Sequence, residues 1–256
     1  MIITRLLYLL FMVILIFFVA HWFLSLFFQT FFQHRYASHR MFTMSKPWER
    51  IFYFLAFIFE GASFLNPRAY AMMHREHHAY SDTEKDPHSP HFFTDVFQMM
   101  KATIITFRDH LNRTKNPDKQ FAGYYPEWPI IDRIGSSIAS RLLFGAAYTW
   151  FYIVFVPAGS EWMFLLLPIH YLMGPVHGAI VNWCGHKYGY SNYDNNDKSK
   201  NTTPFDFLML GELFQNNHHK YPNSANFGSK WFEIDPVYPI MKLMHAMKII
   251  KIRKAY

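Results

Sequence analysis

The stretch that most constrains the fold of this chain is the apolar run over residues 2–33, in which Arg5 is the only charged residue. A helix rises about 1.5 Å per residue, so the run predicts a helix of about 48 Å, longer than the ~30 Å hydrocarbon core of a bilayer. We therefore expect one membrane span, over about 5–33, whose end projects beyond the lipid. A cleaved signal peptide is disfavoured, because the run is too long and no small-residue cleavage site precedes a polar start.

Two further apolar runs, 142–158 and 162–184, are separated by a turn signal at residues 157–161. This pattern predicts a transmembrane hairpin. The connecting loop contains no Lys or Arg, whereas Arg141 and Lys187 flank the two free ends of the hairpin. Because Lys and Arg accumulate on the cytoplasmic side, we expect the loop outside the cell and both ends inside it.

A fourth apolar run, over residues 51–66, is predicted to lie in the membrane interface, as an interfacial or re-entrant helix over about 48–68. A single crossing there would separate the histidines before it from those after it by the whole membrane. Glu60 within the run fits partial contact with water. We expect residues 69–137 and 187–256 to be cytoplasmic, and the basic tail over residues 239–256 to form an amphipathic surface helix. The predicted fold is thus an all-α integral membrane protein, one domain over residues 1–256, with a cytoplasmic helical cap.

The composition supports a membrane protein with substantial parts outside the lipid. Hydrophobic residues make up 51% of the chain, yet the mean hydropathy is near zero, because the apolar residues are concentrated in blocks. The net charge of +7 is explained by a cytoplasmic membrane surface. No basic stripe with interleaved aromatics lies outside the membrane segments, so nucleic acid is not expected as a partner. The single cysteine, Cys184, excludes an internal disulfide, an iron–sulfur cluster and a c-type haem.

Histidines gather beside the apolar runs. His74, His77 and His78 are spaced i, i+3, i+4, so on a helix they share one face, and Gln215, His218 and His219 repeat the spacing. A further pair, His34 and His39, follows the first apolar run. These two lie about 140° apart on a regular helix, so either the helix ends between them or they serve different metals. One such cluster is often only a polar helix face, but three clusters beside membrane segments predict a metal site.

The number of histidines predicts two metals rather than one. Asn182 and His186 are spaced i, i+4 at the end of the third span, and His186 completes a set of eight histidines. Zinc takes four ligands, so we expect two metals with about four protein nitrogens each and with open positions. Two irons in such sites suit O₂ chemistry. Zinc-dependent hydrolysis, with Glu76 as general base, is the alternative from the residues alone.

Several other side chains are candidates for orienting the histidines through their ring N–H groups. These are Asp82, Asp86, His88, Glu212 and His177, although each carboxylate also fits a turn or a surface position. His170 and His177 lie within the third span, where ionisable residues suggest function. A hydrogen-bonded packing role is the more common explanation for both.

The motifs resemble those of the membrane fatty acid desaturases, particularly the acyl-CoA (stearoyl-CoA-type, delta-9-like) branch in its short bacterial form without a fused cytochrome domain. The similar stretches are HRYASHR at residues 34–40, HREHHAYSDTEKDPHS at 74–89, NWCGHKYGY at 182–190 and GELFQNNHHKYP at 211–222. The first of these histidine motifs, at residues 34–40, and the residues flanking the motifs differ from those of alkane hydroxylases and of the sterol desaturase group.

The resemblance implies a diiron centre that uses O₂ to insert a cis double bond into an acyl chain. Asn182 matches an asparagine that approaches one metal, and Gln215 departs from the histidine usual in this branch. Zinc is expected to compete for the iron positions in overexpressed material. The implied metal ligands are His34, His39, His74, His77, His78, Asn182, His186, Gln215, His218 and His219.

The resemblance also implies partners. The substrate is expected to be a fatty acyl chain, with CoA as the carrier, and two electrons per turnover are expected from a separate protein such as a ferredoxin, or a b5-type cytochrome with its reductase. The active site is expected at the cytoplasmic face. A non-catalytic metal-binding membrane protein and a transporter are the competing classes. The transporter is disfavoured, because the polar residues gather at one edge of few spans and no repeated halves are present.

Overall fold

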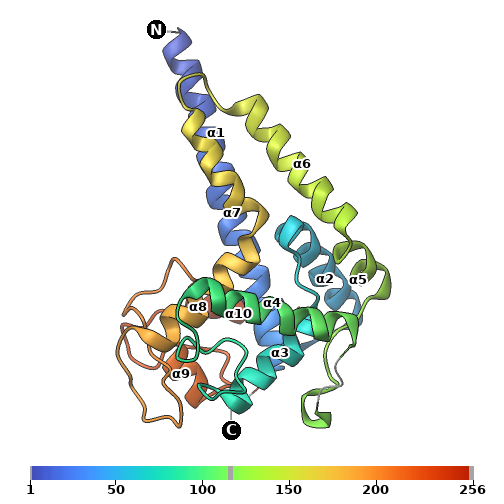
Figure 1. Cartoon of the computed structure of the whole chain (residues 1–256), viewed down its shortest axis with the longest axis vertical. Helices are drawn as coiled ribbons and strands as arrows, with labels where there is room; N and C mark the ends of the chain where they lie inside the picture. The colour runs from blue at the N-terminus through green and yellow to red at the C-terminus, as the bar shows by residue number, and fades with distance from the viewer. Residues whose placement is uncertain (1, 115–117, 254–256) are drawn as a thin grey trace.

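The computed structural model describes residues 2–114 and 118–253 of the chain. It is elongated: a shaft formed by α1, α6 and α7 stands on a wider part that holds the other labelled helices (Figure 1). The helices of the described residues are α1 (Ile2–Phe28), the π-helix η1 (Gln29–Ser38), α2 (Lys46–Glu60), η2 (Gly61–Ser63), α3 (Pro67–Tyr80), α4 (Val96–Asn112), η3 (Lys119–Phe121), α5 (Pro129–Gly135), α6 (Ile138–Phe155), η4 (Glu161–Leu166), α7 (Leu167–Tyr171), α8 (Met173–Lys187), α9 (Gln215–Lys220) and α10 (Val237–Ala246).

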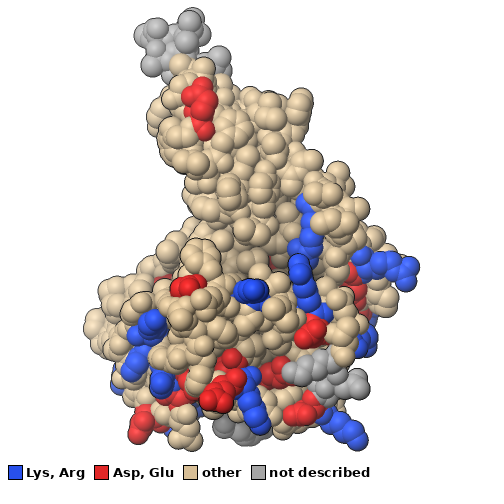
Figure 2. Space-filling view, viewed as in Figure 1, with Lys and Arg blue, Asp and Glu red and all other residues tan. Residues whose placement is uncertain are grey.

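The shaft has the properties of a membrane-crossing unit. Two described helical stretches, Leu7–Ser38 and Ile138–Phe155, are long and apolar enough to span a bilayer. The shaft is almost free of charged side chains in the view of Figure 2, whereas Lys, Arg, Asp and Glu gather on the wider part. The predicted all-α membrane architecture with few transmembrane helices is therefore confirmed.

The third predicted span is broken rather than straight. Residues Glu161–Tyr171 run along the shaft, and Met173–Lys187 continue at an angle of 74° to them. As a result α7 lies beside α1, where Phe17 stacks on His170, while α8 crosses the base of the shaft (Figure 1). The bend places the C-terminal end of α8, with His186, among the other histidines rather than on the axis of the span.

Helix α3 carries the HREHH motif, and its start is fixed by local signals. Asn66 caps the helix by accepting a hydrogen bond from the backbone N–H of Ala69, and Pro67 occupies the first turn, where its missing N–H costs nothing. Helix α2 precedes it and has 15 residues, about 22 Å, which is shorter than the ~30 Å hydrocarbon core. Its buried residues repeat at helical spacing while Ile51, Phe54 and Ile58 stay exposed, which fits an interfacial helix.

The C-terminal tail differs from its predicted form. Only Val237–Ala246 is helical, as α10, and Ile250–Ile252 form the strand β2. This strand pairs antiparallel with β1 (Phe42–Met44), in a register that sets Phe42 opposite Ile252. The prediction of one basic surface helix over this tail is therefore wrong for its second half; residues 254–256 lie outside the described part. Through this pairing the end of the tail packs on the segment after His39, with Ile250 buried, while Leu243 and Met247 of the tail stay exposed.

The π-helix η1 connects the shaft to the wider part and is anchored through Arg35. The guanidinium of Arg35 is fully buried and lies 2.9 Å from Asp235. It also donates to the backbone carbonyl of Ala225 and stacks 3.9 Å from the ring centre of Phe227. These contacts attach the segment after α9 to η1, so the first and last histidine clusters are held together by a buried, fully paired charge.

Candidate metal centre

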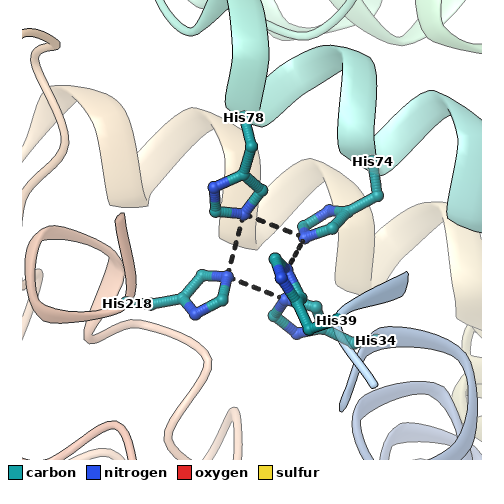
Figure 3. A group of neighbouring side chains, drawn as sticks. All are labelled: His34, His39, His74, His78 and His218. Carbon is teal, nitrogen blue, oxygen red and sulfur yellow. Dashed lines mark hydrogen bonds between the residues drawn. The ribbon is translucent and has the colours of Figure 1, made fainter. Parts of the chain in front are cut away.

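Five histidines from distant parts of the chain meet at one point (Figure 3). Each offers a ring nitrogen, and these nitrogens all lie within 4.8 Å of one another. Their Nε2 atoms approach closely: His39 to His74 at 2.7 Å, His34 to His218 at 3.0 Å, and His78 to His74 and His218 at 3.0 and 2.9 Å. The members of this five-histidine group are His34, His39, His74, His78 and His218.

The π-helix explains how His34 and His39 reach the same group. The backbone N–H of His39 donates to the carbonyl of His34 at 3.2 Å, and the hydroxyl of Ser38 donates to the carbonyl of Gln33 at 2.8 Å. In a π-helix residues five apart lie one above the other, as residues four apart do in an α-helix. The first predicted alternative is confirmed, since η1 ends at Ser38, between the two histidines, and both belong to one group.

The protonation state of these histidines favours metal binding, because a neutral imidazole has a lone pair to offer. Burial and the neighbouring imidazoles lower the pKa of His39, His74, His78 and His218 well below the usual value. Neutral imidazoles each carry one nitrogen lone pair and one N–H, so a ring of close Nε2 atoms cannot be satisfied by mutual hydrogen bonds alone. A cation at their common centre satisfies all of the lone pairs, and the five-histidine group therefore fits a bound metal.

A second group consists of His77, His186 and His219. In each, Nδ1 is held by a carboxylate: Asp86 for His77 and Asp82 for His186, both at 2.9 Å, and Asp197 for His219 at 2.6 Å. The three Nε2 atoms are buried and have no hydrogen-bond partner among the described residues. An aspartate on one ring nitrogen and a free lone pair on the other is the usual arrangement of metal-bound histidine, so this group also fits a metal.

The carboxylates of the second group are ionised. Burial alone would raise the pKa of Asp82, but its hydrogen bond to His186 and the charge of that ring bring the value to about 2. Burial likewise opposes ionisation of Asp86 and Asp197, and the paired histidines outweigh it and lower both pKa values. These aspartates are anions that fix the ring orientation at any physiological pH.

The two groups adjoin. His77 and His78 are consecutive on α3, His218 and His219 are consecutive on α9, and each helix thus supplies ligand candidates to both groups. The rings of His78 and His219 are 4.4 Å apart between centres. All eight predicted histidines are brought together, although as groups of five and three rather than about four each.

The two amide candidates border a cavity beside these groups. Asn182 and Gln215 both line it. The Gln215 amide donates through Nε2 to the backbone carbonyl of Glu212 at 2.7 Å, which leaves its Oε1 as the atom able to bind a cation or water. Gln215 packs so closely on Gly185 that a Cβ at this glycine would lie 2.4 Å from Gln215 Cγ. The Gly185 position is thus required for the present placement of Gln215.

Of the side chains predicted to orient the histidine rings, some contact these rings in the structure through a ring nitrogen and others do not. Asp82 and Asp86 hold histidines of the second group, and Glu212 lies 2.7 Å from His34 Nδ1. Asp197 was not predicted, because it lies in a loop rich in Asn and Asp whose composition indicates only turns. His88 approaches Thr103 at 3.4 Å and packs 4.9 Å from the His77 ring without a hydrogen bond to it.

The other histidines of the third span, His170 and His177, lie outside both histidine groups. His177 lies beside Gln29, with Nδ1 3.2 Å from its Oε1, and belongs to neither histidine group. The His170 ring bonds His21 at 2.6 Å and the Tyr152 hydroxyl at 3.0 Å, all three buried. Glu76, the candidate base for zinc hydrolysis, is turned to His110 at 3.0 Å, so it is not free to activate water at either group.

The cavity that adjoins the histidines is largely apolar. It holds about 870 Å³ of empty space, counting the part open to solvent. His34, His74 and Gln215 border it at the metal end, and Met100 and Ile104 of α4 and Gly178 of α8 line it farther out. Its apolar lining is that of a site for a hydrophobic ligand.

The family is decided by comparison with known proteins. A family model described as fatty acid desaturase matches residues 7–250, almost the whole chain. The chain belongs to the fatty acid desaturase family. The resemblance inferred from the histidine motifs, including the delta-9-like branch, is thereby confirmed.

Curated relatives of this desaturase-family chain are 27–28% identical to it. An acyl-CoA 5-desaturase from Anemone leveillei is 28% identical over 217 residues, 82% of this chain and 62% of the relative. An sn-1 stearoyl-lipid 9-desaturase from Synechocystis sp. is 28% identical over 222 residues, 85% and 64%. A hex-5-enoyl-[acyl-carrier protein] acetylenase from Moorena producens is 27% identical over 247 residues, 86% and 70%. The chain spans less than two thirds of the length of the first two.

Proposed function

We propose that this desaturase-family protein uses O₂ to insert a cis double bond into a fatty acyl chain at a histidine-bound diiron centre. The observation that carries the proposal is an apolar cavity bordered by His34 and His74 of the five-histidine group, which the three-histidine group adjoins. A hydrocarbon chain in that cavity would lie beside the five-histidine group. A zinc hydrolase is not favoured, because Glu76 is paired with His110.

The proposed ligands follow the two groups. His34, His74, His78 and His218 would hold one iron, together with His39, and His77, His186 and His219 would hold the other. The second group offers fewer histidines, so Gln215 and Asn182 would complete it through an amide oxygen or a bound water. Zinc would compete for both positions, because imidazole binds zinc well.

When bound, the iron pair supplies O₂ activation and the removal of two hydrogens from adjacent carbons. Overall, one saturated bond, O₂, two electrons and two protons give one double bond and two waters. The electrons would come from a separate one-electron carrier, such as a ferredoxin or a b5-type cytochrome with its reductase. We propose that the centre faces the cytoplasm, where such carriers are found.

The residues of the chain contribute orientation and exclusion of water. Asp82, Asp86 and Asp197 hold the Nδ1 protons of three ligands, so that each Nε2 lone pair points to the centre. Met73 and Phe107 line the cavity and keep the reacting carbons in an apolar surrounding. Tyr70 stacks on His74 with the rings 5.8 Å apart and supports the ligand from its cavity side.

The proposal leaves the identity of the acyl carrier to be determined. Sequence resemblance favours acyl-CoA. The relatives named above are described as acting on acyl-CoA, on a stearoyl lipid and on a chain linked to acyl-carrier protein.

Expression in a host with a simple fatty acid profile tests the function. New double bonds, measured by gas chromatography of the total fatty acids, are expected with the native chain and not with His218→Ala, because that variant removes a nitrogen central to the five-histidine group. A non-catalytic metal-binding protein would instead purify with metal bound and leave the fatty acids of the host unchanged.

A further inference from the structure

The cavity has its mouth between α4 and α8. On α4 it is lined by Met100, Thr103, Ile104 and Phe107, which form one stripe of the helix. Ile104 is 39% exposed, so this part of the lining reaches the surface. On the opposite wall, a Cβ added at Gly178 would meet no atom within 4 Å. Both residues thus line the cavity, and the space in front of Gly178 is open.

The mouth lies at the base of the apolar shaft. Both α4 and α8 cross beneath the shaft in Figure 1, and α8 is the bent continuation of a broken span. The outer face of α4 exposes Phe97 and Ile105, 82% and 52% exposed, together with the cations Lys101 and Arg108. Apolar residues mixed with Lys and Arg on one exposed helix face are typical of a helix in the membrane interface. The mouth thus opens where acyl chains meet their head groups.

The charges of the cavity suit a hydrocarbon chain without a polyanionic carrier. No Lys or Arg of the described residues lines it, and its one carboxylate, Glu212, is paired with His34. The cations close to the other side of the centre, Arg40, Lys251 and Arg253, surround a separate hollow at His39. That hollow shares no lining residue with the cavity. The cavity therefore suits the hydrocarbon part of a substrate, and any phosphate of its carrier must stay outside the cavity.

We infer that the substrate is an acyl chain still esterified to a membrane glycerolipid, and that the chain enters sideways from the bilayer between Ile104 and Gly178. This inference rests on the proposed function and specifies its substrate class. Only hydrocarbon crosses the mouth, and the phosphate of the lipid stays outside, beside Lys101 and Arg108 on the outer face of α4. A phosphate carried by CoA has the same charge, so the experiment must separate the two sources.

The test presents three stearoyl substrates separately to the iron-loaded full chain in nanodiscs with a reduced ferredoxin system: phosphatidylglycerol with stearoyl at sn-1, stearoyl-CoA and stearoyl-acyl-carrier protein. A second readout, independent of iron and donor, is photocrosslinking by a phosphatidylglycerol with a diazirine in its acyl chain, mapped by peptide mass spectrometry. Gly178→Phe fills the mouth from α8 and Ile104→Trp narrows it from α4. Leu172→Phe is the matched control, since Leu172 is 54% exposed and lies outside the cavity.

The lipid is expected to be desaturated, with crosslinks in peptides covering residues 96–112 and 173–187. Both signals should fall at least about tenfold in Gly178→Phe and Ile104→Trp and stay unchanged in Leu172→Phe. Desaturation confined to stearoyl-CoA or to the carrier-protein substrate would overturn the inference and leave the proposed function standing. Desaturation of none of the three would refute the proposed function, and crosslinks outside both helices would refute the route of entry.

Discussion

At the scale of single residues, metal binding at the candidate centre would depend on which ring nitrogen each histidine leaves free. In the three-histidine group Asp82, Asp86 and Asp197 decide this by holding Nδ1, and the buried Nε2 atoms are left without partners among the described residues. Asp197 makes the shortest of these contacts, at 2.6 Å to His219. It lies in the polar segment between α8 and α9, so that segment has a role in the site beyond connecting two helices.

Replacement of Asp197 tests this role. Asp197→Asn removes the negative charge that fixes the His219 ring, and we expect metal affinity at the three-histidine group to fall by about 10–100-fold. Competition with a chelator, followed by metal analysis, should show one of two metals lost first. Asp194→Asn, an exposed position in the same loop, is the control. Equal retention of both metals in Asp197→Asn and in the native chain would contradict the role.

Gln215 is expected to be a weak ligand, because an amide oxygen is a less basic donor than imidazole nitrogen. Gln215→Ala should lower turnover and keep the iron of the five-histidine group, whereas His219→Ala should abolish turnover. Gln215→His should be tolerated and should tighten the second metal. Turnover and iron content of the three variants, measured together, check the order. If Gln215→Ala leaves turnover unchanged while His177→Ala removes an iron, then His177 is the ligand instead.

At the scale of elements, the sequence predicts where helices lie better than what kind of helix they are. The apolar run over residues 2–33 correctly predicts a long helix ahead of His34. Hydrophobic periodicity cannot show that its end widens into a π-helix, because η1 is buried almost all round and presents no polar face to mark its period. The bend at Leu172 has a local sequence signal, because Gly174 and Pro175 follow it and can bend a helix, but hydropathy does not show it since both halves of the broken span are apolar.

The buried polar contact between α1 and α7 is predicted to couple His21 and His170 energetically. His21 and His170 bond each other at 2.6 Å inside the shaft, so replacing one leaves the other unpaired in an apolar surrounding. His21→Phe and His170→Phe should each lower the free energy of unfolding by about 1–3 kcal/mol. The double variant should cost less than their sum, by about 0.5–3 kcal/mol of coupling energy. Denaturant unfolding in detergent measures the cycle, and strict additivity would show that the pair is not coupled.

At the scale of the whole molecule, the metal centre connects segments that are far apart in the chain. Ligand candidates come from η1, α3, α8 and α9, and the two-stranded sheet joins the segment after His39 to the C-terminal tail. Sequence motifs predict the candidate ligands, because their spacing is local, but not the division into groups of five and three, which depends on how four separate segments pack. The helices of the shaft, α1, α6 and α7, contribute none of the candidate ligands. They orient the wider part of the molecule relative to the membrane.

The proposed metals would bind only the assembled site, so their removal should destabilise the wider part of the molecule. A metal whose free concentration is about 100 times its dissociation constant adds about 2.7 kcal/mol to the free energy of unfolding. Chelation is therefore expected to lower the midpoint of thermal unfolding by roughly 5–10 °C in detergent. Adding Fe(II) back should restore it in the native chain and not in His78→Ala, which lacks a nitrogen of the five-histidine group. An unchanged midpoint after complete metal removal would mean that the site is preformed without metal.

The arrangement of the chain across the membrane follows from α2. With 15 residues it is too short to span the ~30 Å hydrocarbon core, so its two ends should lie on one side of the bilayer. All histidines of both groups then share that side, and the loop between α6 and α7 lies on the other.

In a Cys184→Ser background, cysteines placed at the exposed positions Ser45 and Lys85 should react with an impermeant reagent from the same side, in inverted vesicles. A cysteine at Ala158, in the loop between α6 and α7, should react only in intact cells. Labelling of Ser45→Cys and Lys85→Cys from opposite sides would show that α2 crosses, and such a crossing would pull His39 and His78 apart, which the close contact of their rings does not permit.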